Sequence, residues 1–228
     1  MAREIVLDTE TTGFEPSQGH RLVEIGCIEL INHLPTGRIF HTYINPERDV
    51  PEEAYNVHGL SYDFLKAHPL FRDVGSLFLD FIEDSPLVIH NAKFDMKFIN
   101  AELKTHALNQ VPFERAIDTL LMARKKFPGS PASLDALCKR FGVNNKARDK
   151  HGALLDAELL AQVYLELMGG KQPSLSLHVS QNEREIIQKT KEEKTFRAPR
   201  PHGPTQEELT LHEELVEKLK EPLWQKKA

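Results

Sequence analysis

The sequence predicts an α/β fold: a mixed, five-stranded sheet flanked by helices, with a largely extended C-terminal tail. Three strand-like segments follow one another near the start of the chain, and strand-like and helical segments alternate after them. This order is typical of a sheet that combines antiparallel and parallel strands and carries helices on its faces. Beyond residue 170 only 15 of the remaining 58 residues are hydrophobic. We therefore expect a folded domain, residues 1–170, followed by a linker and tail.

The strands are indicated by short apolar runs that turn residues separate. Between the second and third runs, Pro35 and Gly37 favour a turn over Asn32–Gly37. The predicted strands are Glu4–Asp8, Leu22–Ile31, Arg38–Asn45 and Pro86–His90.

The helices are indicated by apolar residues that recur every three or four positions. We expect Asn91 to cap the third helix and Ser133 to cap the fourth, and the pair Gly169-Gly170 to close the last one. The predicted helices are Pro51–Val57, Asp73–Glu83, Ala92–Leu103, a segment from Ser133 through Phe141, and Ala153–Met168.

Composition limits the class of protein. The 228 residues carry 29 basic and 34 acidic side chains, a net charge of −5, which argues against a broad basic surface for nucleic acid but leaves an enzyme with an acidic metal site open. Cys27 and Cys138 have no CxxC spacing, so we expect buried, reduced thiols. With no apolar run of 18 residues and no apolar signal region after Met1, we expect a cytoplasmic protein without a membrane segment.

The first carboxylate pair ends the first predicted strand. Asp8 and Glu10 are two residues apart, so their side chains face the same side. Two anions held side by side repel each other unless a divalent cation lies between them. The turn Thr11-Thr12-Gly13 that follows offers backbone amides to a phosphate or a terminal hydroxyl. The alternative is an exposed strand end before an ordinary turn.

Two further acidic positions lie at the ends of predicted elements. Asp95 follows a buried strand and lies one turn into a helix, where ligands bind in α/β folds, although the helix dipole alone favours an aspartate there. Asp156 is a charge in an otherwise apolar helix, and His151 precedes that helix; the alternative is a solvated aspartate and a surface histidine. Together, four carboxylates and a histidine can meet at one face of the sheet.

Such a cluster predicts metal-assisted phosphodiester hydrolysis. Carboxylate oxygens favour Mg²⁺ or Mn²⁺ over zinc. Two such ions roughly 4 Å apart suit an in-line displacement on phosphorus. A histidine near its ordinary pKa can accept the proton of the attacking water as general base.

These residues carry a family resemblance. The strings DTETTG, HNAKFD and HGALLD resemble the three motifs of the DEDDh 3′→5′ exonucleases, which have an RNase H-like fold, and the resemblance covers about residues 4–168. It implies that His151 is the general base and that two divalent ions, Mg²⁺ or Mn²⁺, are bound by Asp8, Glu10, Asp95 and Asp156.

The same resemblance implies substrate contacts. His58, in the segment Val57-His58-Gly59-Leu60, is expected to touch the 3′-terminal nucleotide, and Phe94 to border its base or simply to pack in the core. We expect Thr11, Asp8, Glu10 and Asp156 to contact substrate as well. Of the remaining motif residues, His90 and Asn91 are expected to support or cap, and Asp118 and Asp135 to be structural.

The linker, residues 171–203, begins with a short apolar peptide. Residues 172–177, QPSLSL, resemble the peptide with which bacterial replication proteins bind the sliding clamp. This resemblance implies that Gln172, Leu175 and Leu177 enter a pocket of the clamp (beta) subunit. A linker of unrelated function could supply the same six residues.

The segment 204–228 predicts an amphipathic helix. Thr205 and Glu208 read as a capping box, and the leucines after it form an apolar face that an isolated short helix cannot stabilise alone. The arrangement is similar to that of proofreading subunits of bacterial replicative polymerases, which implies binding to the polymerase (alpha) subunit through Leu215, Leu219, Leu223 and Trp224. The alternative is a frayed end that packs on its own domain.

The combined interpretation is a metal-dependent 3′→5′ DNA exonuclease. It would proofread by excising mispaired 3′-terminal nucleotides as monophosphates from single-stranded or frayed ends. Its partners would be DNA, the polymerase, the clamp and, in some systems, a small theta-like accessory subunit, without a membrane. One alternative is an RNA-trimming or general DNA-degrading nuclease with the same motifs, which the tail disfavours. The other is a scaffold without catalysis, which the intact set of carboxylates disfavours.

Overall fold

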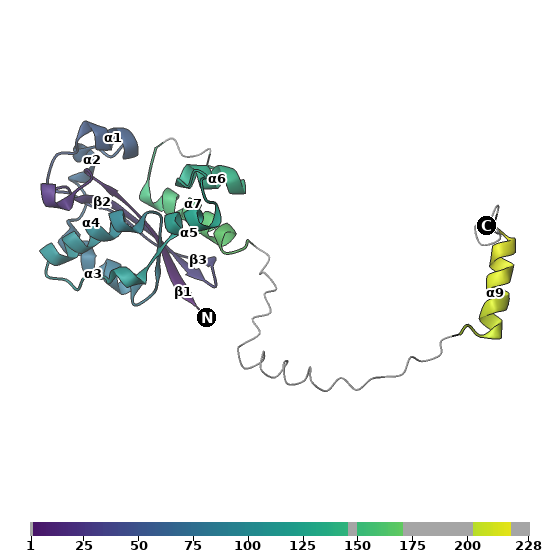
Figure 1. The fold of residues 1–228 in the computed structure, drawn as a ribbon. Helices are drawn as coiled ribbons and strands as arrows, with labels where there is room; N and C mark the ends of the chain where they lie inside the picture. Colours follow the sequence, from purple (N-terminus) through teal and green to yellow (C-terminus); the bar gives the residue numbers. More distant parts are fainter. Residues whose placement is uncertain (1, 146–149, 171–202, 220–228) are drawn as a thin grey trace. The chain divides into compact units, whose positions relative to one another are not determined.

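The computed structural model describes residues 2–145, 150–170 and 203–219 (Figure 1). The chain divides into two units, Met1–Ser174 and Leu175–Ala228, which are described separately. No helix in the described ranges is long and apolar enough to cross a membrane.

The first unit is built on a five-stranded sheet in the order β3-β2-β1-β4-β5. β1 pairs antiparallel with β2, and β2 with β3, whereas β1–β4 and β4–β5 are parallel pairs. The predicted mixed sheet is therefore confirmed. The strands are β1 Arg3–Thr11, β2 Leu22–Ile31, β3 Leu34–Tyr43, β4 Leu87–Ile89 and β5 Ala116–Asp118.

The turn predicted over Asn32–Gly37 was wrong, because β3 begins at Leu34 and contains Pro35 and Gly37. Asn32 and His33 have φ values of 51° and 67° and form a two-residue connection between β2 and β3, the backbone geometry that tight hairpins require. Pro35 is tolerated because β3 is an edge strand of the sheet.

The helices of the first unit lie on both faces of the sheet. The sequence missed α2 and α5 and placed the other helix ends within a few residues. Short 3₁₀ turns occur at Pro16–Gln18 and Phe113–Arg115. The helices are α1 Glu52–His58, α2 Tyr62–Leu65, α3 Phe71–Ile82, α4 Ala92–Thr105, α5 Thr119–Lys126, α6 Leu134–Phe141 and α7 Ala153–Leu167.

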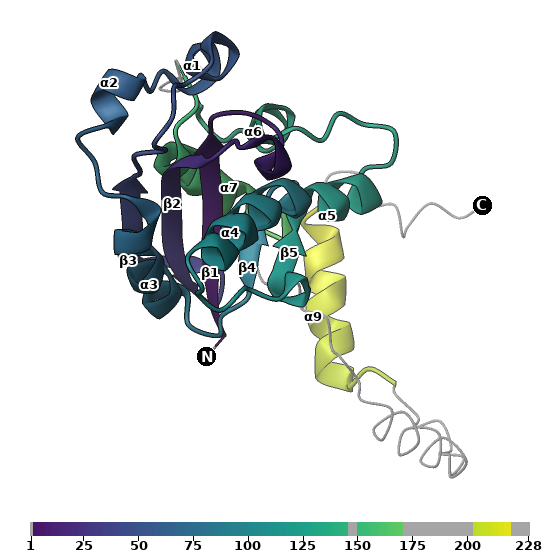
Figure 2. The same ribbon diagram turned by 90° about the vertical axis from the view of Figure 1, so that its left-hand side faces the viewer.

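Two apolar clusters hold these layers together. The alternation along β1 sends Ile5 and Leu7 to the side covered by α3 and α4 and Val6 to the side covered by α5, α6 and α7. Figure 2 shows α3 and α4 in front of the sheet and α7 behind it. Cys27 is buried in the first cluster and Cys138 in the second, as expected for reduced thiols. The same alternation decides which layer each polar residue of β1 can reach.

In the second unit, the described part is the helix α9, Gln206–Glu217. The predicted capping box is present: the Thr205 hydroxyl accepts a hydrogen bond from the Glu208 amide, and the Glu208 carboxylate accepts one from the Thr205 amide. Leu215 and Leu219 are 59% and 45% exposed. The predicted clamp peptide 172–177, together with Leu223 and Trp224, lies outside the described residues.

Candidate active site

An acidic cavity of about 260 Å³ opens where β1 meets the start of α7. Four of the five predicted catalytic residues line it, from motifs at the two ends of the domain sequence. Asp8 and Glu10 come from β1, Asp156 from the first turn of α7, and His151 from the segment just before that helix. The cavity is lined by Asp8, Thr9, Glu10, His90, Ser133, Leu134, Asp135, His151 and Asp156.

Within this acidic cavity, Glu10, His151 and Asp156 each offer a ligand atom, and these atoms lie within 4.8 Å of one another. His151 Nδ1 lies 3.2 Å from Asp156 Oδ2. Asp156 is 3% exposed, whereas 46% of the His151 side chain is accessible. The arrangement pairs a buried carboxylate with a histidine that solvent can reach.

A glycine allows α7 to come this close to the sheet. Gly26 on β2 lies directly opposite Asp8 of β1. A Cβ built on Gly26 would lie 2.4 Å from the Ala153 carbonyl carbon and the Leu154 nitrogen, a distance that the backbone of α7 cannot accommodate. The missing side chain therefore sets the position of the first turn of α7, and with it that of Asp156.

Gly26→Ala is expected to displace that turn. The added methyl group should cost about 1–3 kcal/mol of stability through overpacking and should lower activity further by moving Asp156. Thermal unfolding and a nuclease assay would measure the two effects. Gly203→Ala is the matched control, because a Cβ there meets nothing within 4 Å. An unchanged melting temperature and rate for Gly26→Ala would contradict this role.

Asp95 is placed differently from the other predicted ligands. It lies on α4, is 3% exposed, and accepts a hydrogen bond of 2.7 Å from the Thr9 hydroxyl. Burial raises its pKa well above the ordinary value for an aspartate. Since Thr9 stands between Asp8 and Glu10 on the opposite face of β1, Asp95 reaches the same strand from the other layer. It does not line the acidic cavity, and its role as a metal ligand stays a prediction.

The prediction that the Asn91 side chain caps α4 was wrong. Asn91 occupies the N-cap position with φ of 64°, and its side chain makes no capping hydrogen bond. The Asp118 carboxylate accepts hydrogen bonds from the Asn91 and Ala92 amides instead, and it also caps α5 through the Leu120 amide. Asp118 is therefore structural, as expected. His90, which lines the acidic cavity, bonds to the Thr119 hydroxyl.

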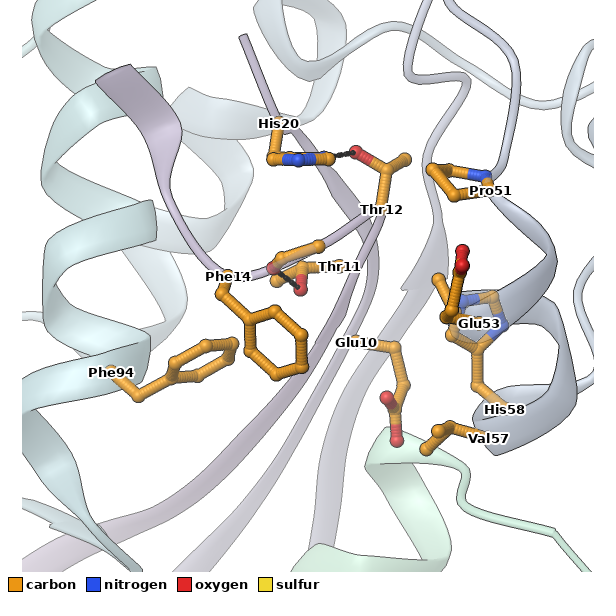
Figure 3. A pocket seen from close by; sticks show the side chains of 12 residues that line it. Glu10, Thr11, Thr12, Phe14, His20, Pro51, Glu53, Val57, His58 and Phe94 are labelled. Carbon is orange, nitrogen blue, oxygen red and sulfur yellow. Dashed lines mark hydrogen bonds between the residues drawn. The ribbon is translucent and has the colours of Figure 1, made fainter. Parts of the chain in front are cut away.

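Next to the acidic cavity lies an apolar cavity of about 450 Å³ (Figure 3). Glu10 lines both cavities. The predicted substrate residues Thr11, His58 and Phe94 all line it. Sequence reasoning missed Phe14, which lines the same cavity as Phe94 (Figure 3) and is 81% exposed. The cavity is lined by Glu10, Thr11, Thr12, Gly13, Phe14, His20, Pro51, Glu53, Ala54, Val57, His58 and Phe94.

The two site histidines differ in their surroundings. His58 is 5% exposed, and its Nδ1 accepts a hydrogen bond from the Leu60 amide. Burial lowers the pKa of His58 to about 4, so the ring is neutral near pH 7 and carries its proton on Nε2. His58 can therefore donate a hydrogen bond but is a poor base, whereas His151 is accessible and adjoins a carboxylate.

The sequence model of the family described as "Exonuclease" matches residues 5–164. The chain is 53% identical to the DNA polymerase III subunit epsilon of Rickettsia felis over 94% of this chain and 95% of the relative. It is 48% identical to the subunit of the same name from Salmonella typhimurium, over 75% and 73% respectively. The chain belongs to the DNA polymerase III epsilon subunits, in the exonuclease family.

The fold agrees with this membership. The structure of Exonuclease X in complex with 5′ overhanging duplex DNA is 26% identical, with a TM-score of 0.57, over 74% of this chain and 91% of the other. The predicted RNase H-like exonuclease fold is thereby confirmed. As a member of the epsilon family, the chain is a 3′→5′ exonuclease, and exonucleases of this type depend on divalent metal ions.

Proposed function

We propose that this epsilon-family chain proofreads newly made DNA: it hydrolyses the last phosphodiester of a single-stranded or frayed 3′ end and releases a deoxynucleoside monophosphate. The observation that carries the proposal is the shared wall of the two cavities. Glu10 lines both, so a terminal base held in the apolar cavity brings its 5′ phosphodiester to the carboxylates of the acidic one.

The donor set fits divalent metal ions. Asp8, Glu10 and Asp156 supply carboxylate oxygens to one cavity, which suits Mg²⁺ or Mn²⁺. Asp8, Glu10 and Asp156, with Asp95 by family resemblance, would hold two such ions. When bound, the ions would activate a water and stabilise the charge on the leaving oxygen. They would also offset the repulsion among the carboxylates.

His151 is the general base of this proposal. With its Nδ1–H donated to Asp156 Oδ2, the ring presents Nε2 for the proton of the attacking water. Its exposure lets that proton pass to solvent. His58, neutral and protonated on Nε2, would donate a hydrogen bond to the terminal nucleotide instead.

The apolar cavity accounts for a preference for unpaired ends. A base can stack against the rings of Phe14 and Phe94 only after it leaves the duplex stack. A mispaired terminus leaves the stack at a lower free-energy cost than a matched one. Selection would therefore come from the DNA end, and the cavity would accept any of the four bases.

A primer with a 3′-terminal mismatch is expected to lose its last nucleotide several-fold faster than the matched primer, because fraying costs less. Rates on the two duplexes, on the single strand and on RNA of the same sequence would measure the preference. Equal rates on both duplexes would contradict proofreading. Faster digestion of RNA than of DNA would favour the RNA-trimming alternative.

The tail would connect this nuclease to its partners. Residues 1–170 would form the nuclease domain, residues 172–177 the clamp peptide within a linker 171–203, and residues 204–228 the polymerase-binding segment. The polymerase contact is supported by the relatives' name, DNA polymerase III subunit epsilon, and by the exposed Leu215 on α9 and Leu219 just after it.

Alanine at Gln172, Leu175 and Leu177 should weaken clamp binding and spare polymerase binding, and alanine at Leu215, Leu219, Leu223 and Trp224 should do the reverse. Leu177 and Leu215 are separated by more than thirty residues of sequence, so we expect the two sets of substitutions to act independently. Pull-downs with each purified partner would measure both, with Thr210→Ala on α9 as the control. Full polymerase binding by a fragment ending at Gly170 would contradict this division.

A further inference from the structure

The segment that carries the proposed base, His151, is held at the end of α1. α1 closes at Gly59, whose φ of 76° places it in the left-handed region. Next to that end, the His151 amide donates a 3.1 Å hydrogen bond to the Val57 carbonyl oxygen. The segment that carries His151 is thus attached to a helix nearly a hundred residues earlier in the chain.

Lys150 makes the second attachment. Its ammonium nitrogen lies 4.6 Å from the centroid of the Tyr55 ring and 3.4 Å from the Tyr55 carbonyl oxygen. A cation over an aromatic face is attracted electrostatically, and a cation at the C-terminus of a helix interacts favourably with its dipole. Lys150 therefore has two reasons to stay at this end of α1.

The aliphatic stem of Lys150 lies close to Gly59. A Cβ built on Gly59 would lie 2.6 Å from Lys150 Cδ, so the glycine leaves the room in which the stem lies. Three features at the end of α1 therefore receive this one side chain: a ring, a carbonyl oxygen and a glycine.

These contacts lie between the two cavities and outside the core. Tyr55 is 41% exposed and Lys150 is exposed, and neither belongs to an apolar cluster. On the same helix, Val57 and His58 line the apolar cavity (Figure 3), while His151 lines the acidic one. α1 thus touches the place proposed for the terminal nucleotide and, through Lys150, the segment that carries the proposed base.

We infer that Tyr55 and Lys150 are positioning residues, which hold His151 at the scissile bond by fastening its segment to the end of α1. This inference rests on the proposed function, in which His151 is the base. The contact sets the rate of the chemical step and contributes little to DNA affinity, because neither side chain lines either cavity. The competing role for Lys150 is a direct contact with a DNA phosphate.

The test uses the full chain with Tyr55→Leu, Lys150→Met and the double substitution, and it measures the single-turnover rate and KM on single-stranded DNA. Each single variant should lose roughly tenfold in rate, because a small displacement of a catalytic group is costly, with KM changed less than about twofold. The double variant should be no slower than Lys150→Met, because that single substitution already removes the contact of the ammonium group with the Tyr55 ring.

Conservative variants separate positioning from general damage. Tyr55→Phe keeps the ring and Lys150→Arg keeps the cation, so both should retain most of the rate. Lys66→Met, just after α2, is the matched control, since its exposed ion pair with Asp63 contributes little to stability. Melting temperatures close to that of the unsubstituted chain should accompany all variants.

Three results would overturn the inference. One is a Tyr55→Leu protein with the full rate. Another is a Lys150→Met protein with raised KM and unchanged rate, which would make the lysine a phosphate contact. The third is a double variant whose loss equals the product of the single losses.

The background variant His151→Ala separates the inference from the proposed function. With the base removed, Tyr55→Leu should have no further effect on the rate. A fully active His151→Ala protein would refute the proposed function whatever the other variants do. If His151→Ala lowers the rate but Tyr55→Leu does not, the positioning role is refuted and the proposed function stands.

Discussion

Asp8→Ala is expected to lower exonuclease activity by about 10²–10³-fold, the usual cost of removing one group that stabilises the transition state, while the domain stays folded. Asp8 lines the acidic cavity with Glu10 and Asp156, so its removal takes one carboxylate from the proposed metal site. The same change relieves repulsion between neighbouring anions, which offsets the favourable interactions that the Asp8 side chain makes. The metal-free variant should therefore melt at or above the temperature of the unsubstituted protein.

Single-turnover hydrolysis and thermal unfolding, each with and without excess Mg²⁺, would test both halves of this expectation. Mg²⁺ should raise the melting temperature of the unsubstituted protein, because a ligand that binds the native state stabilises it, and should do so less for Asp8→Ala. Asp63→Ala is the control, since that carboxylate is 86% exposed and pairs with Lys66. Near-normal hydrolysis by Asp8→Ala in excess metal would remove the proposed metal site.

His151→Ala is expected to slow the chemical step by roughly 10²–10⁴-fold, the usual contribution of a general base. DNA affinity and metal binding should change much less, because the carboxylates remain in place. Raising the pH should restore part of the lost rate, since hydroxide in solution replaces the missing proton acceptor.

Quenched-flow single-turnover assays at several pH values would measure the rate of the chemical step, and a metal titration would measure metal binding. His212→Ala, a substitution on α9 in the other unit, serves as the control. If His151→Ala loses metal binding in proportion to its activity, the histidine is a ligand and the base must be another group.

Much of the site could be predicted from short-range patterns. Residues two apart on a strand share a face, so the spacing of Asp8 and Glu10 was enough to place both in one cavity. The other wall of the acidic cavity was indicated by the charge of Asp156 within an apolar helix and by the neighbouring His151. The Ser133 cap of α6 and the capping box of α9 were also readable, because their partners lie within three residues.

The features that sequence reasoning missed depend on long-range contacts or on very short elements. β5 has only three residues, too few to show a period. Asparagine often caps a helix, but the Asn91 side chain does not; the carboxylate of Asp118, 27 positions away, accepts the amide hydrogen bond at the start of α4 instead. The edge position that makes Pro35 acceptable, and the approach of α7 to Gly26, become visible only once the strand order is known.

Metal-dependent 3′→5′ hydrolysis can be tested by digesting a 5′-labelled single-stranded oligonucleotide with the purified full-length chain, with Mg²⁺ or Mn²⁺ and with EDTA. The proposed reaction should give a ladder that shortens one nucleotide at a time from the 3′ end, with deoxynucleoside 5′-monophosphates as the only small product and no cleavage in EDTA. Internal cuts, release of the labelled 5′ nucleotide, or undiminished digestion in EDTA would contradict it.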